Sequence, residues 1–177
     1  MYVRRERVGE ERAVHAVHAA AFRGDGEILG EPVEAGLADE LRSTGAAIPQ
    51  LCLVAVVERV VVGHVVCSRG WIRGEAAVDQ PALGLGPIGV QPDHQNRGIG
   101  QAMMHAVLGA ADALDEPLVA LLGEPAYYSR FGFQPSHVHG IAAPDDSWGD
   151  YFQVRTLTAH DPHVRGTFHY AAPFDGL

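Results

Sequence analysis

A long amphipathic helix between two short apolar strands is the feature of this sequence that most constrains its fold. Apolar side chains recur at three- and four-residue steps from Ile99 to Leu114, and Asp115-Glu116-Pro117 ends the pattern. The apolar runs at residues 82–90 (ALGLGPIGV) and 118–122 (LVALL) predict a strand on either side of this helix. Strand, helix and strand in immediate succession predict a mixed α/β fold.

The rest of the chain adds further helices and strands. The predicted helices span residues 10–22 and 32–42, and the predicted strands span residues 2–8, 51–57, 60–67, 152–157 and 166–174. Only Glu58-Arg59 separates the two central β-branched runs, which indicates a tight hairpin. No repeat or linker divides the 177 residues, so we predict a single domain that spans residues 1–177.

The composition excludes several classes of protein. Hydrophobic residues make up 47% of the chain and the formal net charge is -9, which argues against a nucleic-acid partner. The amino-terminal segment lacks the apolar core of a signal peptide, and no apolar run reaches the roughly 20 residues of a membrane-spanning helix. We therefore expect no membrane association and a cytoplasmic location. Cys52 and Cys67 lie in valine-rich runs and are expected to be buried, reduced thiols.

Two patterns resemble known sites but do not predict them. Residues 84–89 read G-x-G-x-x-G, yet Pro87 and Pro92 interrupt the helix that a dinucleotide site needs. Glycines inside a strand indicate instead a bulge or a close backbone approach. The histidines at 137–139 and 160–163 lack the spacing of a zinc site, so we expect no metal. His15 and His18 share one helix face, where surface or packing roles are expected.

The segment QNRGIG (residues 95–100) predicts a site for phosphate groups. The first N–H groups of the helix that follows have no intrahelical partner, and the helix dipole adds partial positive charge there. Gly98 and Gly100 carry no Cβ, so phosphate oxygens can approach the backbone closely, and Arg97 adds a full charge. The lysine and Ser/Thr of a P-loop are missing, which indicates a pyrophosphate that is held rather than hydrolysed.

Two motifs in order resemble the GNAT superfamily of N-acetyltransferases. QNRGIG matches its Q/R-x-x-G-x-G/A signature, and YYSRFGF (residues 127–133) resembles its F-Y-x-x-x-G-F element. From the Phe22 region to GTFHYAAPF, the chain is similar to the YhbS-like branch in particular. The resemblance implies a central, mostly antiparallel twisted sheet that is splayed at the acetyl-CoA site and flanked by helices. The chain departs from the family pattern at Gly123-Glu124-Pro125, where many members carry asparagine, and at Tyr127, where phenylalanine is common.

This resemblance implies acetyl-CoA-dependent transfer of an acetyl group to a primary amine of a small molecule, a peptide or a protein, by direct attack. Tyr128 is the expected general acid, with the adjacent Tyr127 as the alternative, and Glu124 is a candidate for the unassigned base or simply a solvated loop residue. The implied cofactor-binding residues are Ile88, Gly89 and Val90 for the pantetheine arm, and Gln95, Asn96, Arg97, Gly98, Ile99, Gly100 and Gln101 for the phosphates.

Other possibilities remain open from the sequence. A non-catalytic acyl-CoA-binding sensor would share the same motifs, whereas a nucleotide hydrolase is disfavoured by the absent lysine. The resemblance implies that the segment from Phe22 to Leu41 largely sets the acceptor, and its Glu27, Glu31 and Glu34 either attract a cation or simply face water. The tail from Trp148 is expected either to line the site or to contribute to a homodimer.

Overall fold

The structure is a computed structural model that describes residues 1–23, 30–74 and 78–176. Within these residues one sheet contains nine strands. They are β1 (Tyr2–Arg5), β2 (Ala47–Val57), β3 (Val60–Arg73), β4 (Gln80–Val90), β5 (Leu118–Leu122), β6 (Gln134–Pro135), β7 (Ile141–Ala142), β8 (Phe152–Thr156) and β9 (Gly166–His169). The helices are α1 (Glu11–Ala21), α2 (Val33–Ser43), α3 (Ile99–Ala113) and the short α4 (Pro125–Tyr128).

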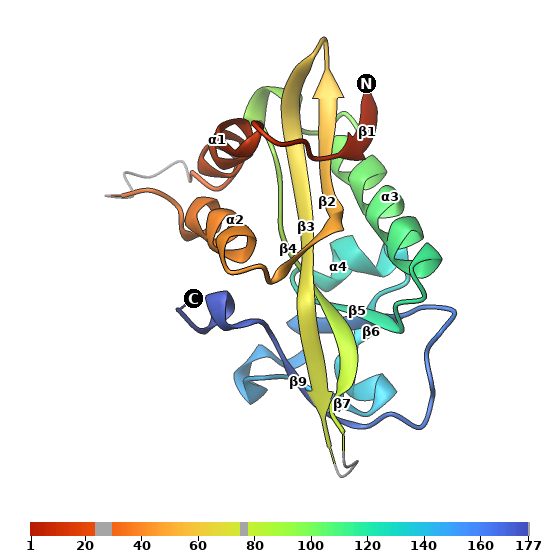
Figure 1. The fold of residues 1–177 in the computed structure, drawn as a ribbon. Coiled ribbons are helices and arrows are strands. Elements are labelled where there is room, and N and C mark those ends of the chain that lie inside the picture. Colours follow the sequence, from red (N-terminus) through yellow and green to blue (C-terminus); the bar gives the residue numbers. More distant parts are fainter. Residues whose placement is uncertain (24–29, 75–77, 177) are drawn as a thin grey trace.

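The sheet is mostly antiparallel and carries helices on both faces. Its strand order is β1-β2-β3-β4-β5-β8-β6, while β9 pairs with both β3 and β7. Only the pairs β4–β5 and β7–β9 are parallel. In Figure 1 the long strands β2, β3 and β4 form the axis of the molecule, with α1 and α2 on one side and α3 on the other. This arrangement confirms the predicted mixed α/β fold class.

The side chains of β2 point alternately to the two faces of the sheet, which explains why both faces are covered. Leu53 and Ala55 belong to the core cluster that α3 completes with Met103 and Val107. Val54 and Val56 point to the opposite face and pack with residues of α1 and α2. Each fully buried aliphatic side chain contributes roughly 1.5–3 kcal/mol relative to exposure. The apolar run of β2 therefore supplies two hydrophobic cores at once.

Most predicted elements are confirmed. The hairpin turn at Glu58-Arg59 has positive φ angles of 49° and 70°, the type of two-residue turn that suits twisted strands. The hairpin strands are longer than predicted, and β1 is shorter. The predicted strand over 166–174 is wrong beyond His169, because a 3-10 helix covers Ala172–Gly176 and Pro173 cannot donate to a ladder. Glu27 lies outside the described residues.

The sheet opens between β4 and β5. These strands pair only at Leu83–Val119 and Gly84–Ala120. Beyond Gly84, β4 continues to Val90 along β3, while β5 continues along β8. The two halves of the sheet therefore separate at β4, the strand that contains Gly84, Gly86 and Gly89, as the resemblance implies.

Both cysteines are free, as expected. Cys67 is buried and Cys52 is half-buried. Burial raises the pKa of the Cys52 thiol to about 12 and raises that of Cys67 as well, so both stay protonated at neutral pH. Among the described helices, none combines the length and apolar character needed to cross a membrane.

Candidate active site

The end of β4 and the start of α3 enclose a cavity of about 440 Å³. Of the predicted cofactor-binding residues, all except Arg97 line it. Arg97 lies on the same loop with its side chain exposed to solvent. The cavity is also lined by His94, Tyr127, Tyr128 and Arg130. The structure therefore brings the two sequence motifs together around one space.

Local backbone geometry shapes this loop. Asn96 and Gly98 both adopt positive φ angles, of 58° and 78°, so the chain turns sharply before α3 begins. The Gln95 side-chain amide donates to the Val90 carbonyl at 3.0 Å and ties the loop back to β4. Gly98 is the N-cap residue of α3, and no side chain caps this helix. The first N–H groups of α3 are therefore available to an anion.

Gly100 allows a close approach that a larger residue would prevent. A Cβ at this position would lie 3.3 Å from the Tyr127 hydroxyl oxygen. The Arg130 guanidinium carbon lies 4.7 Å from the centre of the Tyr127 ring, a cation–π contact that holds a positive charge at the cavity. Sequence reasoning missed Arg130, a variable position of YYSRFGF, and His94, which directly precedes QNRGIG.

A second cavity of about 690 Å³ adjoins the first. Its lining comes from segments far apart in the sequence, including Phe22 after α1, Glu34 of α2, β4, β5 and the carboxyl-terminal segment from Trp148 to Asp175. Ile88 and Tyr128 line both cavities. The residues from Trp148 onward thus line the site, one of the two roles expected for the tail.

Tyr128 stands where the two cavities meet. Its ring packs edge-on against Tyr127, with ring centres 4.9 Å apart, and a side chain at Gly123 would overlap it. Burial, with a smaller contribution from Tyr127, raises the pKa of Tyr128 to about 12. The hydroxyl is therefore protonated at neutral pH. Tyr127 lines only the first cavity.

Glu124 has a structural role beside these tyrosines. Its carboxylate accepts a hydrogen bond from the Ala126 backbone N–H at 3.3 Å and caps α4. Glu124 lines neither cavity and is exposed. This geometry favours the loop role that the sequence left open for it.

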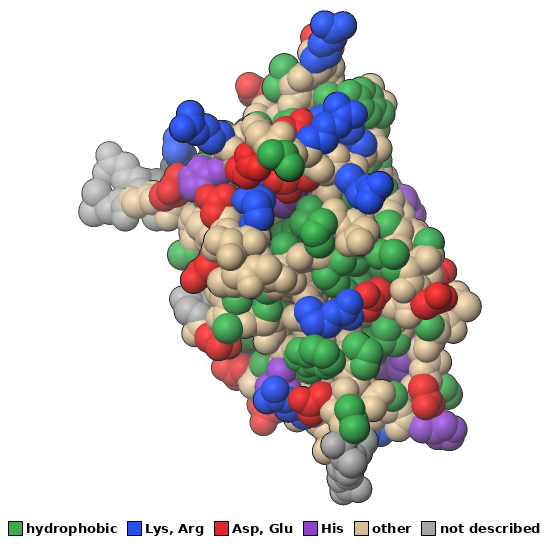
Figure 2. Space-filling view, in the orientation of Figure 1, with side chains coloured by type: hydrophobic (Ala, Val, Ile, Leu, Met, Phe, Trp, Pro, Cys, Tyr) green, Lys and Arg blue, Asp and Glu red, His purple; other side chains and the backbone are tan. Residues whose placement is uncertain are grey.

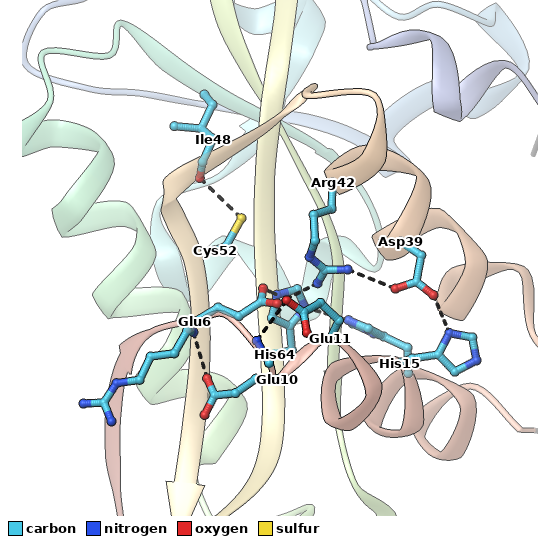
Figure 3. Close-up of polar contacts among 12 residues, drawn as sticks. Glu6, Glu10, Glu11, His15, Asp39, Arg42, Ile48, Cys52 and His64 are labelled. Carbon is cyan, nitrogen blue, oxygen red and sulfur yellow. Dashed lines mark hydrogen bonds and ion pairs between the residues drawn. The ribbon is translucent and has the colours of Figure 1, made fainter.

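A polar network fixes the helices that wall the second cavity (Figure 3). Arg42 of α2 pairs with Glu6 at 2.7 Å and with Asp39 at 3.0 Å, and Asp39 contacts His15 of α1 at 2.6 Å. The other Glu6 oxygen lies 3.3 Å from His64 Nε2. The network therefore ties α1 and α2 to β3 and to the chain after β1.

Two buried histidines extend this network to β4. His18 Nε2 lies 2.8 Å from His64 Nδ1, and both side chains are buried. Burial, and then His64, lowers the pKa of His18 to about 3, while Glu31 and Asp39 raise the pKa of the half-exposed His15. A Cβ at Gly89 would lie 3.0 Å from His18 Nδ1, so α1 packs directly on β4. The packing role expected for His18 is confirmed.

Within residues 1–23, 30–74 and 78–176, no group of three or more His, Cys, Asp or Glu side chains could hold a metal ion. On the face shown in Figure 2, basic side chains are interspersed with acidic ones. The charge pattern of this face is thus a mixture of both signs.

A splayed sheet with a glycine-rich helix start beside the opening defines the acyltransferase class of the GNAT fold. Residues 49–135 match the acetyltransferase (GNAT) domain family. The chain is 33% identical to the uncharacterized N-acetyltransferase YjhQ of Escherichia coli K12 over 145 residues, 79% of each protein. It is 31% identical to the uncharacterized N-acetyltransferase YhbS of the same strain over 125 residues, 70% of this chain and 72% of YhbS. The chain belongs to the GNAT acetyltransferase family.

Two solved structures share the fold over nearly the whole chain. YhbS from Escherichia coli, in complex with CoA, superposes with a TM-score of 0.85 at 26% identity, covering 98% of this chain and 91% of that one. A GNAT family acetyltransferase from Brucella melitensis, in complex with acetyl-CoA, gives a TM-score of 0.75 at 27% identity, covering 98% and 97%.

Proposed function

We propose that this protein transfers the acetyl group of acetyl-CoA directly to a primary amine of a small molecule or a peptide. The observation that carries this proposal is the junction at Ile88 and Tyr128, which both cavities share. A thioester lying along β4 would present its carbonyl carbon there, within reach of an amine in the second cavity. The CoA and acetyl-CoA complexes of the two structural relatives support the first ligand.

The first cavity fits the coenzyme through its backbone. The free N–H groups of Ile99, Gly100 and Gln101 and the dipole of α3 favour a pyrophosphate at the helix start. Arg130 lines the same cavity and adds a positive charge. Ile88 to Val90 provide the strand edge along which the pantetheine arm would lie.

Transfer forms one bond and breaks another. The amine nitrogen bonds to the carbonyl carbon while a backbone N–H between Ile88 and Val90 stabilises the charge on the oxygen. As the carbon–sulfur bond breaks, the Tyr128 hydroxyl donates its proton to the sulfur. The raised pKa of Tyr128 suits this role, since the donor stays protonated. The attacking amine loses its proton to solvent, and the Tyr128 phenolate takes a proton back from solvent once the thiol has formed.

We propose further that residues 1–177 act as one catalytic domain. The second cavity supports this, because its lining extends from Phe22 to Asp175, well beyond the matched segment 49–135.

A thiol-release assay tests the proposed function. Acetyl-CoA is incubated with the protein and a panel of amines, and free thiol and acetylated amine are both quantified. We expect the two products in equal amounts. The chain contains no lysine, so acetylation of added peptides is readily separated from modification of the enzyme. Tight CoA binding by calorimetry without any acetylated amine would instead indicate the acyl-CoA-binding sensor.

A further inference from the structure

Aromatic side chains form much of the wall of the second cavity. Phe22, Trp148, Tyr170 and Phe174 all line it, together with Tyr128. The rings of Tyr170 and Phe174 are stacked with centres 4.5 Å apart. A Cβ at Gly84 would lie 2.7 Å from Tyr170 Cδ1, so this ring lies directly on β4. The aromatic wall is therefore held by packing on both sides.

The charged groups of this cavity are mainly of one sign. Glu34 comes from α2, Asp145 lies before the 3-10 helix Asp146–Tyr151, and Asp175 belongs to the carboxyl-terminal 3-10 helix. No arginine is among the described residues that line the cavity, and His169 is the one basic side chain there. Three carboxylates from three separate elements thus line an aromatic space, Asp145 and Asp175 at its exposed side, where Asp145 Oδ1 also accepts the Ser147 backbone N–H at 2.8 Å.

We propose that the acceptor is a primary amine on an apolar, aromatic body that carries no carboxylate. This inference rests on the proposed function and names the substrate class of the same site. The carboxylates attract the ammonium form by Coulomb attraction, and the aromatic faces contact both the cation and the apolar body. An acceptor with its own carboxylate, such as a free amino acid, would meet three like charges, with His169 as the one basic side chain beside them.

The volume of the cavity favours a body of this kind over a simple alkylamine. Cavities of about 300–1,000 Å³ hold molecules of drug-like size, and this one measures about 690 Å³. A polyhydroxylated amine of similar size would leave its hydroxyl groups against Phe22, Trp148 and Phe174. Those rings offer apolar faces and few hydrogen-bond partners, so a hydroxyl-rich acceptor would lose its hydration without compensation.

Matched amines test the class directly. Phenethylamine and phenylalanine differ only by a carboxylate, and phenylalaninamide replaces that carboxylate by a neutral amide. We expect kcat/KM for phenethylamine to exceed that for phenylalanine by about 30-fold, as three carboxylates at about threefold each would give. Phenylalaninamide should recover most of the difference, and ethanolamine should be a poor acceptor. Equal kcat/KM for phenylalanine and phenethylamine would overturn the inference.

Substitutions identify the groups responsible. Asp145→Asn and Glu34→Gln should each reduce the preference for phenethylamine over phenylalanine by about threefold. Asp146→Asn is the matched control, because Asp146 is the next residue, is exposed and does not line the cavity. Trp148→Ala should raise KM for phenethylamine more than KM for ethanolamine. An equal effect of Asp146→Asn and Asp145→Asn would contradict a role for the cavity carboxylates.

A binding measurement separates this inference from the proposed function. The chain has two tryptophans, and the variant Trp71→Phe leaves Trp148 as the single tryptophan, which is excited selectively over the tyrosines at long wavelength. Phenethylamine should change the Trp148 fluorescence of the CoA-loaded protein at concentrations where phenylalanine does not. If this selectivity is seen without turnover, the cavity has the proposed specificity but the proposed function is wrong. If turnover is seen with phenylalanine preferred, the proposed function stands and this inference falls.

Discussion

The two cavities of the active site are built in different ways. The first is formed largely by the backbone of one continuous segment, residues 88–101, joined by the tyrosines of α4. The second is formed by side chains from α1, α2, the sheet and the carboxyl-terminal segment. A backbone cavity depends on a few glycines and a helix start, so a short motif reveals it. A side-chain cavity depends on contacts between distant segments, and its chemistry is set separately at each position.

The largest effect should come from the residue that the two cavities share. Tyr128→Phe should lower kcat by about 10²- to 10⁴-fold, the range for loss of a general acid, while CoA affinity by calorimetry stays unchanged. Because the pKa of Tyr128 is raised to about 12, kcat should show no fall from deprotonation of this acid below that pH. Tyr127→Phe should cost less, since Tyr127 lines only the first cavity. A larger loss for Tyr127→Phe would exchange their roles.

A charge at the helix start should affect only the first cavity. Gly98→Asp should weaken CoA binding by about 30-fold, because a carboxylate is placed beside the phosphates. The aspartate Cβ would meet no atom within 4 Å, and although a φ of 78° strains any side chain, aspartate adopts such angles more often than most residues. Gly109→Asp, on the exposed side of the same helix, is the matched control. Equal CoA affinities for both variants would place the phosphates elsewhere, and a change in the amine KM would show that the cavities are not separable.

A smaller effect is expected from crowding the shared tyrosine. Gly123→Ala would place a Cβ in the space of the Tyr128 ring, which must then move. Small displacements of a reacting group cost about 10-fold or more in rate, so we expect kcat to fall about 10-fold with little change in CoA affinity. Gly109→Ala, whose Cβ would meet no atom within 4 Å, should leave kcat unchanged. An unaffected kcat in Gly123→Ala would show that the position of the Tyr128 ring is not critical.

The packing of α1 on β4 should make the stability of the protein depend on pH. The pKa of His18 is about 3 when folded and about 6.5 in a free chain, so the unfolded state binds more protons between these values. The contribution of His18 to the free energy of unfolding is therefore fully present above pH 6.5. It decreases as the pH drops towards 3, by about 1.4 kcal/mol per pH unit for one such group.

Urea unfolding across this pH range measures the effect. His18→Gln should flatten the dependence, because the amide does not titrate. His15→Gln should act in the opposite sense, since the raised pKa of His15 gives stability at low pH that is lost as the pH rises through the folded value. An unchanged slope in His18→Gln would mean that His18 titrates normally in the folded protein.

Much of the fold was predictable from local patterns. The period of α3, the Glu58-Arg59 turn and the glycines of β4 each reflect interactions among near neighbours in the chain. Errors occurred where distant contacts decide, as in the tail after His169, which leaves the sheet. Arg130 was missed because only folding brings it to the first cavity, and His94 because it lies just outside the QNRGIG motif.

The sequence by itself indicated the GNAT family, the splayed strand and the loop that lines the first cavity, because all of them depend on short motifs whose glycines and helix start act through the backbone. The tertiary structure decided the rest. Only the packing of α1, α2 and the carboxyl-terminal segment around β4 brings Glu34, Trp148 and Asp175 into one cavity. Side chains so far apart in the chain leave no periodic signal, so the character of the second cavity emerged only from the fold.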